Sequence, residues 1–227
     1  MIPDLPFYVS LLFILTVLLS FWLFHRAIRS RMLVYLSLAW LLLTGVLSYS
    51  GFFLDYARFP PHFMIAMLIP LIAILLSFVN SGGRRLIDKI PLLPLVLLSI
   101  VRIPVEIVLY LLYLNKQIPE LMTFAGRNYD ILAGLTVPVI YLVCFKDGQL
   151  TNRRVFLIWN IFSLALLMNI VVNAILSAPF PFQKFGFDQP NKAIFYFPYA
   201  WLPAFIVMTV LFSHLVSIRR ILLRKSG

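Results

Sequence analysis

The sequence predicts an all-α integral membrane protein, a bundle of seven transmembrane helices with its N-terminus outside the cell and its C-terminus in the cytoplasm. Composition is the first reason. Of 227 residues, 62% are hydrophobic and 12% are charged, and a typical soluble domain carries about twice that share of charge. The length of the apolar runs is the second reason, and the distribution of Lys and Arg between those runs is the third.

Seven apolar runs approach the roughly 20 residues that a helix needs to cross the hydrocarbon layer of a bilayer. They cover residues 5–24, 32–53, 61–79, 90–114, 123–145, 155–177 and 194–217, and we treat residues 1–227 as a single transmembrane domain. The fifth run is the weakest because Arg127, Asn128 and Asp130 fall in its first turns. Residues 80–85, Asn-Ser-Gly-Gly-Arg-Arg, are predicted to form a basic loop.

The N-terminal run is predicted to be an uncleaved first span. Residues 1–6 include Asp4 and no basic residue, whereas a secretory signal begins with positive charge. The basic residues instead follow the run.

Lys and Arg are concentrated in alternate connections between the runs. Thirteen lie on one side: Arg26, Arg29, Arg31, Arg84, Arg85, Lys89, Lys146, Arg153, Arg154, Arg219, Arg220, Arg224 and Lys225. Five lie on the other: Arg58, Lys116, Arg127, Lys184 and Lys192. The richer side is therefore predicted to be cytoplasmic, in a plasma (inner) membrane. The net charge of +11 then reflects topology, so we expect membrane lipids as partners and no nucleic acid.

Charged and amide side chains inside these runs mark a candidate site. The fourth run has Arg102 and Glu106 one helical turn apart on one face, with Pro104 between them. A charge near the bilayer centre costs about 2.5 kcal/mol or more, so this face is expected to point into the bundle and to have a function.

Three further runs contribute polar residues in the half of the membrane predicted to be outer. Arg127 and Asp130 begin the fifth run, Asn169 and Asn173 share a face of the sixth, and His62 begins the third. Gly126 and Gly134 are expected to let a neighbouring helix approach closely. The arrangement predicts a polar pocket that opens outward and has Arg102 as its floor.

Three functions are compatible with such a pocket. The first is binding or transport of a small polar or anionic ligand or a lipid headgroup, with Arg102 and Arg127 as positive contacts. The second is a membrane-embedded enzyme acting on a lipid, with Glu106 or Asp130 as general base and His62 near the surface. The third is a structural or assembly subunit, which could have a membrane-protein partner.

In the structural reading the polar residues only hold helices together. Arg102 would pair with Glu106, Arg127 would pair with Asp130 or Glu120, and the two Asn residues would bond across helices.

Motifs for cofactors and for several enzyme classes are absent from the sequence. None of the three histidines has a second histidine three to five residues away, and Cys144 is the only cysteine, so no metal site is predicted. A mixed site of His62, Glu106 and Asp130 is the one exception considered. No Gly-x-Ser-x-Gly or phosphate-binding loop occurs. Retinal is not predicted, because residues 194–217 contain no lysine.

Overall fold

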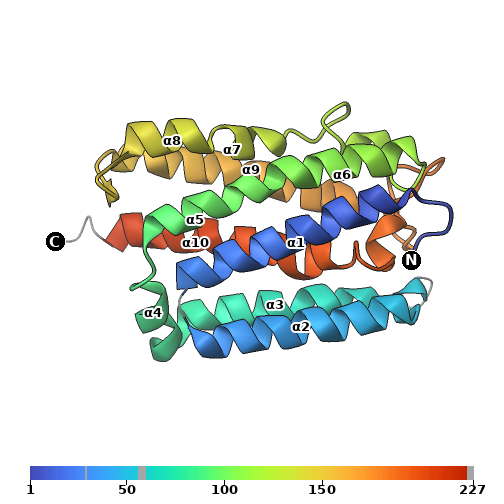
Figure 1. The fold of residues 1–227 in the computed structure, drawn as a ribbon, viewed down its shortest axis with the longest axis horizontal. Coiled ribbons are helices and arrows are strands. Elements are labelled where there is room, and N and C mark those ends of the chain that lie inside the picture. The colour runs from blue at the N-terminus through green and yellow to red at the C-terminus, as the bar shows by residue number, and fades with distance from the viewer. Residues whose placement is uncertain (29, 56–59, 224–227) are drawn as a thin grey trace.

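The computed structural model of residues 1–227 describes the whole chain except residues 29, 56–59 and 224–227. Arg29, Arg58, Arg224 and Lys225, four of the basic residues used to predict orientation, therefore lie outside the described residues. The described chain is an elongated helical bundle (Figure 1). Helix α1 begins at one end of it, and α10 ends at the opposite end.

The bundle is built from ten α-helices among the described residues, three of them very short. Their bounds are α1 Phe7–Ile28, α2 Arg31–Tyr49, α3 His62–Val79, α4 Ser81–Ile87, α5 Leu92–Leu97, α6 Arg102–Leu114, α7 Ile131–Leu135, α8 Val137–Cys144, α9 Arg153–Ser177 and α10 Val207–Leu223. A 3₁₀ turn, η2 (Leu98–Val101), joins α5 to α6, and a π-helical turn, η5 (Leu202–Ile206), leads into α10. Strands β1 (Phe145–Lys146) and β2 (Gln149–Leu150) form a small antiparallel hairpin.

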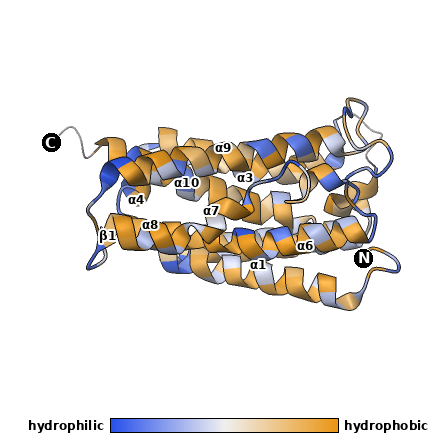
Figure 2. Cartoon of the chain, turned by 90° about the horizontal axis from the view of Figure 1, so that it is seen from above, coloured by the Kyte–Doolittle hydropathy of each residue, from blue (hydrophilic) through white to orange (hydrophobic). Residues whose placement is uncertain are grey.

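Six helical segments in the described part of the chain are long and apolar enough to cross a membrane. They are Phe7–Ile28, Arg31–Tyr49, His62–Val79, Leu92–Leu114, Arg153–Ser177 and Leu202–Leu223. Large apolar side chains are exposed on their outer faces, for example Leu42, Ile72 and Ile158. Figure 2 shows the hydrophobic colour extending along most of the helices. Apolar surface of this extent is unusual on a soluble protein, so the protein is a helical membrane protein.

The fifth predicted run, 123–145, differs from the expected continuous helix. Only its second part is helical, as α7 and α8, which lie over the part of the bundle nearest the β1–β2 hairpin (Figure 1). Residues 123–130 form turns because polar side chains bond to nearby backbone: Thr123 Oγ1 donates to Glu120 O at 2.9 Å and accepts from Ala125 N at 3.3 Å. Such local bonds compete with the helix.

Two other predicted boundaries require correction. The seventh run was predicted to begin at residue 194, but its helix begins at Leu202. Pro198 lacks a backbone N–H and disfavours helical geometry in the residue before it. Residues 80–85 are not a loop, since most of them form α4. Asn80 caps this helix by accepting a hydrogen bond from Gly82 N at 2.9 Å.

Candidate functional site

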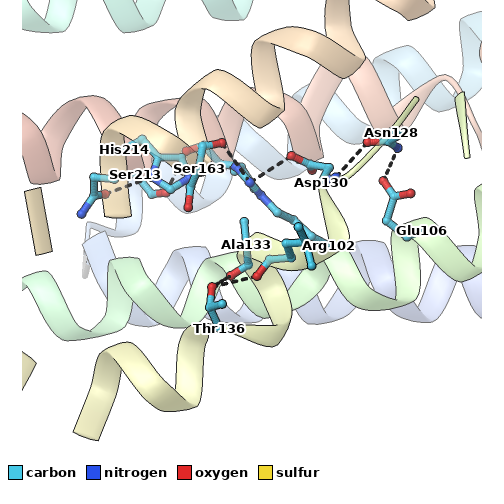
Figure 3. Close-up of polar contacts among 12 residues, drawn as sticks. Arg102, Glu106, Asn128, Asp130, Ala133, Thr136, Ser163, Ser213 and His214 are labelled. Atoms are coloured by element: carbon cyan, nitrogen blue, oxygen red, sulfur yellow. Dashed lines mark hydrogen bonds and ion pairs between the residues drawn. The ribbon is translucent and has the colours of Figure 1, made fainter. Parts of the chain in front are cut away.

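Arg102, at the start of α6, lies at the centre of a buried polar cluster (Figure 3). Its side chain is 2% exposed. Nη1 donates to Asp130 Oδ1 at 3.0 Å and to the Ser163 carbonyl oxygen at 3.1 Å, and Nη2 lies 2.8 Å from His214 Nε2. Arg102 therefore links α6 to the start of α7, to α9 and to α10 through charge-assisted hydrogen bonds, which are the stronger kind.

The hydrogen bonds of His214 define its tautomer. A guanidinium nitrogen can only donate, so His214 Nε2 accepts from Arg102. The proton is then on Nδ1, which donates to Asn160 Oδ1 at 2.9 Å. The Asn160 amide is held in this orientation because its Nδ2 donates to the Phe156 carbonyl at 2.8 Å. The ring also contacts Trp159 edge-on, with 5.7 Å between centroids.

Asn128 connects the cluster to Glu106. Its Nδ2 donates to Glu106 Oε1 at 2.5 Å and to the Met122 carbonyl at 3.1 Å. Its Oδ1 accepts from the backbone N–H of Asp130 at 3.0 Å. A continuous chain of buried polar contacts thus runs from Glu106 through Asn128, Asp130, Arg102 and His214 (Figure 3). Asn128 thereby pairs two backbone groups of this non-helical stretch, the Met122 carbonyl and the Asp130 N–H. Non-helical backbone at membrane depth needs such partners.

Close backbone packing holds α7 beside this chain. A Cβ at Gly134 would lie 2.8 Å from Ile103 Cγ1 and 3.0 Å from the Ser99 carbonyl oxygen. Gly134 therefore allows α7 to approach η2 and α6 closely, as the sequence predicted. Gly126 has a different role, because a Cβ there would collide with the backbone of Glu120 and Leu121 in its own loop.

A cavity with a volume of about 70 Å³ lies beside the polar cluster and is partly open to the outside. Most of the residues that line it are apolar: Phe63, Met67, Val105, Leu109, Met122, Leu167, Ile170, Val171, Ala174, Ile175, Phe180, Ile194, Leu202, Pro203, Ile206, Val207 and Val210. The charged residues of the lining are Arg102, Glu106 and Asp130. The cavity is therefore an apolar space with one charged region, and the prediction of a generally polar pocket was wrong.

The cavity reaches the flank of the bundle. Met67 on α3, together with Val171 and Ile175 on α9, lines it, and all three side chains are partly exposed at the protein surface. Leu202, Pro203 and Ile206 of the π-helical turn η5 also contribute to its wall.

Two polar atoms at the charged region lack a hydrogen-bond partner among the described residues. They are Arg102 Nε and Glu106 Oε2. Both side chains are almost fully buried, at 2% and 1% exposure. Buried donors and acceptors are normally paired; five other buried side-chain atoms of the described residues also lack a partner, among them Ser163 Oγ, on the residue whose carbonyl bonds Arg102.

Arg127, Asn169 and Asn173 do not line the cavity. Asn169 Nδ2 donates to the Arg127 carbonyl at 2.9 Å, and Asn173 Nδ2 donates to Asn169 Oδ1 at 3.2 Å. The Arg127 guanidinium lies over the ring of Phe185, 5.6 Å from its centroid. These residues tie α9 to the 123–130 segment, and the expectation that they contribute to the same pocket was wrong.

His62 is also separate from the cavity. Its ring stacks on Phe52 with 4.5 Å between centroids, at the start of α3, and it is not in the cavity lining. Among the residues that the structure describes, no three His, Cys, Asp or Glu side chains are grouped closely enough to hold a metal ion. The mixed site with Glu106 and Asp130 therefore does not form.

The partner of Arg102 also differs from the structural reading, since Arg102 pairs with Asp130 rather than with Glu106. Sequence reasoning missed His214, Asn160, Asn128 and the Ser163 carbonyl. His214 and Asn160 offered a signal, because both are polar residues inside apolar runs. The His214–Asn160 contact could not be predicted, because the two residues are 54 positions apart and lie in different spans.

Fold and site together define a helical membrane protein with a buried polar chain beside an apolar cavity. The chain belongs to the family described as Domain of unknown function (DUF8737), whose model matches residues 59–222. That match contains every residue of the polar chain and of the cavity lining. No curated protein and no solved structure shows a significant match to the chain.

Proposed function

We propose that this protein binds an elongated apolar or lipid-like molecule in the cavity, which the molecule enters from the membrane between α3 and α9. The observation that carries the proposal is the cavity itself, apolar over most of its wall and charged at one region. Transfer of apolar ligand surface from water is favourable by about 25 cal/mol per Å². For a ligand arriving from lipid, shape and the polar contacts at Arg102 and Glu106 supply the selectivity.

The apolar wall argues against a small polar or anionic ligand. A polar group placed against this wall without a hydrogen-bond partner would lose a few kcal/mol, and an unpaired charge would lose more. Only the region around Arg102, Glu106 and Asp130 can offset that loss. Of the ligands predicted from the sequence, a lipid whose polar end reaches this region is therefore the best match.

A second candidate function is an enzyme that acts on the lipid held in the cavity. Glu106 Oε2 favours it, because this oxygen has no partner among the described residues and belongs to a side chain that lines the cavity. A carboxylate in this position could take a proton from a bound substrate. Conversion of a bound lipid to a product, lost in Glu106→Gln, would identify the enzyme, whereas binding without turnover supports the carrier or receptor.

Seven crossings remain our proposal for topology, in the plasma (inner) membrane with the N-terminus outside. One feature supports it: α1 begins and α10 ends at opposite ends of the bundle (Figure 1). An odd number of crossings produces that arrangement. The fifth crossing would consist of residues 123–130 followed by α7 and α8. Non-helical backbone at membrane depth is tolerated where protein surrounds it.

Cysteine labelling tests this topology in intact cells. In a Cys144→Ala background, Lys116→Cys is expected to react with a membrane-impermeant maleimide added outside, and Asp147→Cys is expected to be protected until the cells are opened. Labelling of both positions from the same side would show that α7 and α8 do not complete a crossing.

Two neighbouring positions on α9 provide a matched test of binding. Val171 lines the cavity, whereas Val172 is 52% exposed on the outer surface. Val171→Trp is expected to remove lipid that copurifies with the protein, measured by native mass spectrometry, while Val172→Trp is expected to retain it. Equal lipid retention in two equally stable variants would reject the proposed function.

A further inference from the structure

A second pocket lies at the end of the bundle that carries the β1–β2 hairpin, where α10 also ends (Figure 1). Its volume is about 620 Å³, a size typical of pockets that bind small molecules, and it is partly open to the outside. Residues from the hairpin, from the start of α5 and from the ends of α9 and α10 line it, among them Leu92, Phe145, Gln149, Leu150, Arg153 and Arg220. It shares no lining residue with the cavity beside Arg102.

Two arginines from different helices give the second pocket a positive lining. Arg153 is the first residue of α9 and Arg220 lies near the end of α10, and no Asp or Glu is among the described residues that line the pocket. The acidic residues of this end lie elsewhere: Asp88 pairs with Arg219 at 3.1 Å, and Asp147 is exposed at the tip of the hairpin. A cleft lined by charges of one sign attracts ions of the opposite sign.

Both arginines can bond to an anion in the pocket. Arg220 Nη1 donates to the Ile90 carbonyl, just before α5, which holds the side chain at the pocket wall. A guanidinium has five N–H donors, so it can hold this carbonyl and also bond to phosphate oxygens. Arg153 is exposed and begins α9, and the partial positive charge at a helix N-terminus adds to the attraction for an anion.

The wall that the hairpin contributes is formed by its local sequence. Asp147 and Gly148 have positive φ angles of 49° and 75°, the conformation that Asp-Gly favours between two antiparallel strands. Phe145 packs edge-on against Phe156 of α9, with 5.3 Å between ring centroids. This contact holds the hairpin against the helix that carries Arg153, so the pocket is formed before a ligand arrives.

We propose that the second pocket binds the phosphate group of a phosphate ester, with the headgroup of an anionic phospholipid as the expected source. Guanidinium groups match the geometry of phosphate oxygens. Leu92, Phe145 and Leu150 give the pocket an apolar side that can contact the rest of a lipid. On the proposed topology this end of the bundle faces the cytoplasmic leaflet, where anionic lipids attract basic residues.

Four probes test the proposal on the purified full-length protein in a neutral detergent: phosphatidylglycerol, phosphatidylcholine and diacylglycerol with the same acyl chains, and glycerol 3-phosphate. Binding is titrated by native mass spectrometry. We expect phosphatidylglycerol to bind at least about tenfold more tightly than phosphatidylcholine, whose ammonium group offsets the phosphate charge, and than diacylglycerol, which has no phosphate. Equal binding of the three lipids would overturn the proposal.

Glycerol 3-phosphate distinguishes the two sources of the phosphate group. Binding at least about tenfold weaker than that of phosphatidylglycerol supports the lipid headgroup as the source. Binding as tight as that of phosphatidylglycerol supports a soluble phosphate ester in the same pocket.

Two adjacent arginines of α9 supply a matched control. Arg153 lines the pocket, whereas Arg154 is exposed and does not. Arg153→Gln should weaken the binding of phosphatidylglycerol about fivefold or more, and Arg154→Gln should weaken it less than about twofold, although each change removes one positive charge. Equal losses would show that the lipid is attracted by the basic surface as a whole, which would overturn the proposal.

Gln149→Glu tests the pocket without removing an arginine. The change places a negative charge in the lining at an exposed position of the hairpin, so the fold should be preserved. Repulsion between this carboxylate and the phosphate should weaken the binding of phosphatidylglycerol about fivefold or more. Unchanged binding in a folded Gln149→Glu variant would show that the phosphate lies elsewhere.

Discussion

Asp130→Asn tests the buried ion pair at the centre of the polar chain. The change removes the negative charge that Arg102 contacts at 3.0 Å, while an Asn Oδ1 can still accept the hydrogen bond. Breaking a buried pair by removing one partner costs about 3–5 kcal/mol, because the other charge stays buried without compensation. Since the hydrogen bond is retained, we expect a loss near the lower end, about 3 kcal/mol in the free energy of unfolding.

The loss should be far smaller when the pair is replaced as a unit. In Arg102→Met/Asp130→Leu neither charge remains, and such replacements are often neutral or stabilising by about 1–4 kcal/mol. The double variant leaves His214 Nε2 without its donor, which costs about 1–3 kcal/mol. We therefore expect it to lie within about 2 kcal/mol of wild type and to be more stable than Asp130→Asn.

Reversible unfolding of the purified protein in mixed micelles, followed by circular dichroism, measures both variants. Asp188→Asn is the matched control, because Asp188 is exposed and exposed charges contribute little. If Asp130→Asn is as stable as this control, the Arg102–Asp130 pair does not stabilise the protein in a bilayer-like environment, and the description of the polar chain is wrong.

Two further predictions concern the segment that carries Asp130. Gly134→Ala places a Cβ against Ile103 and the Ser99 carbonyl, so we expect a loss of about 1–3 kcal/mol in the free energy of unfolding. Gly82→Ala is the control, because the nearest atom to its new Cβ is 3.6 Å away, and it should change the free energy of unfolding little. Equal effects of the two changes would refute the close packing of α7. Asn128→Leu removes the donor to Glu106 and the acceptor for the Asp130 N–H. The amide hydrogens of residues 123–130 should therefore exchange faster with deuterium. Unchanged exchange would show that Asn128 does not hold the segment in place.

The fold could be predicted in large part from the sequence because the membrane imposes one simple requirement. A run of about 20 apolar residues must form a helix if it crosses the bilayer, and six such segments are present among the described residues. The fifth run, 123–145, is the exception. The side chains of Thr123 and Asn128 form hydrogen bonds with neighbouring backbone, and these bonds replace helical ones in the first part of the run. A count of apolar residues does not reveal such bonds.

The candidate site was predicted less completely. The rule that charge inside an apolar run has a purpose identified Arg102, Glu106 and Asp130, which line the cavity. The structural alternative paired Arg102 with Glu106, which was wrong, because Arg102 pairs with Asp130 and that pairing depends on where α7 begins. Asn169 was assigned to the pocket from its depth alone, although its side chain bonds to the Arg127 carbonyl instead.

Photo-crosslinking tests the central claim, that a lipid-like molecule occupies the cavity, most directly. Benzoylphenylalanine at Met67 on α3 or Val171 on α9 faces the cavity from opposite helices, whereas Leu68 and Val172 are exposed at the outer surface. We predict that the two cavity positions capture the same lipid-like species in cells and that the two outer positions capture bulk phospholipid. Identical adducts at all four positions, or none at Met67 and Val171, would contradict the account.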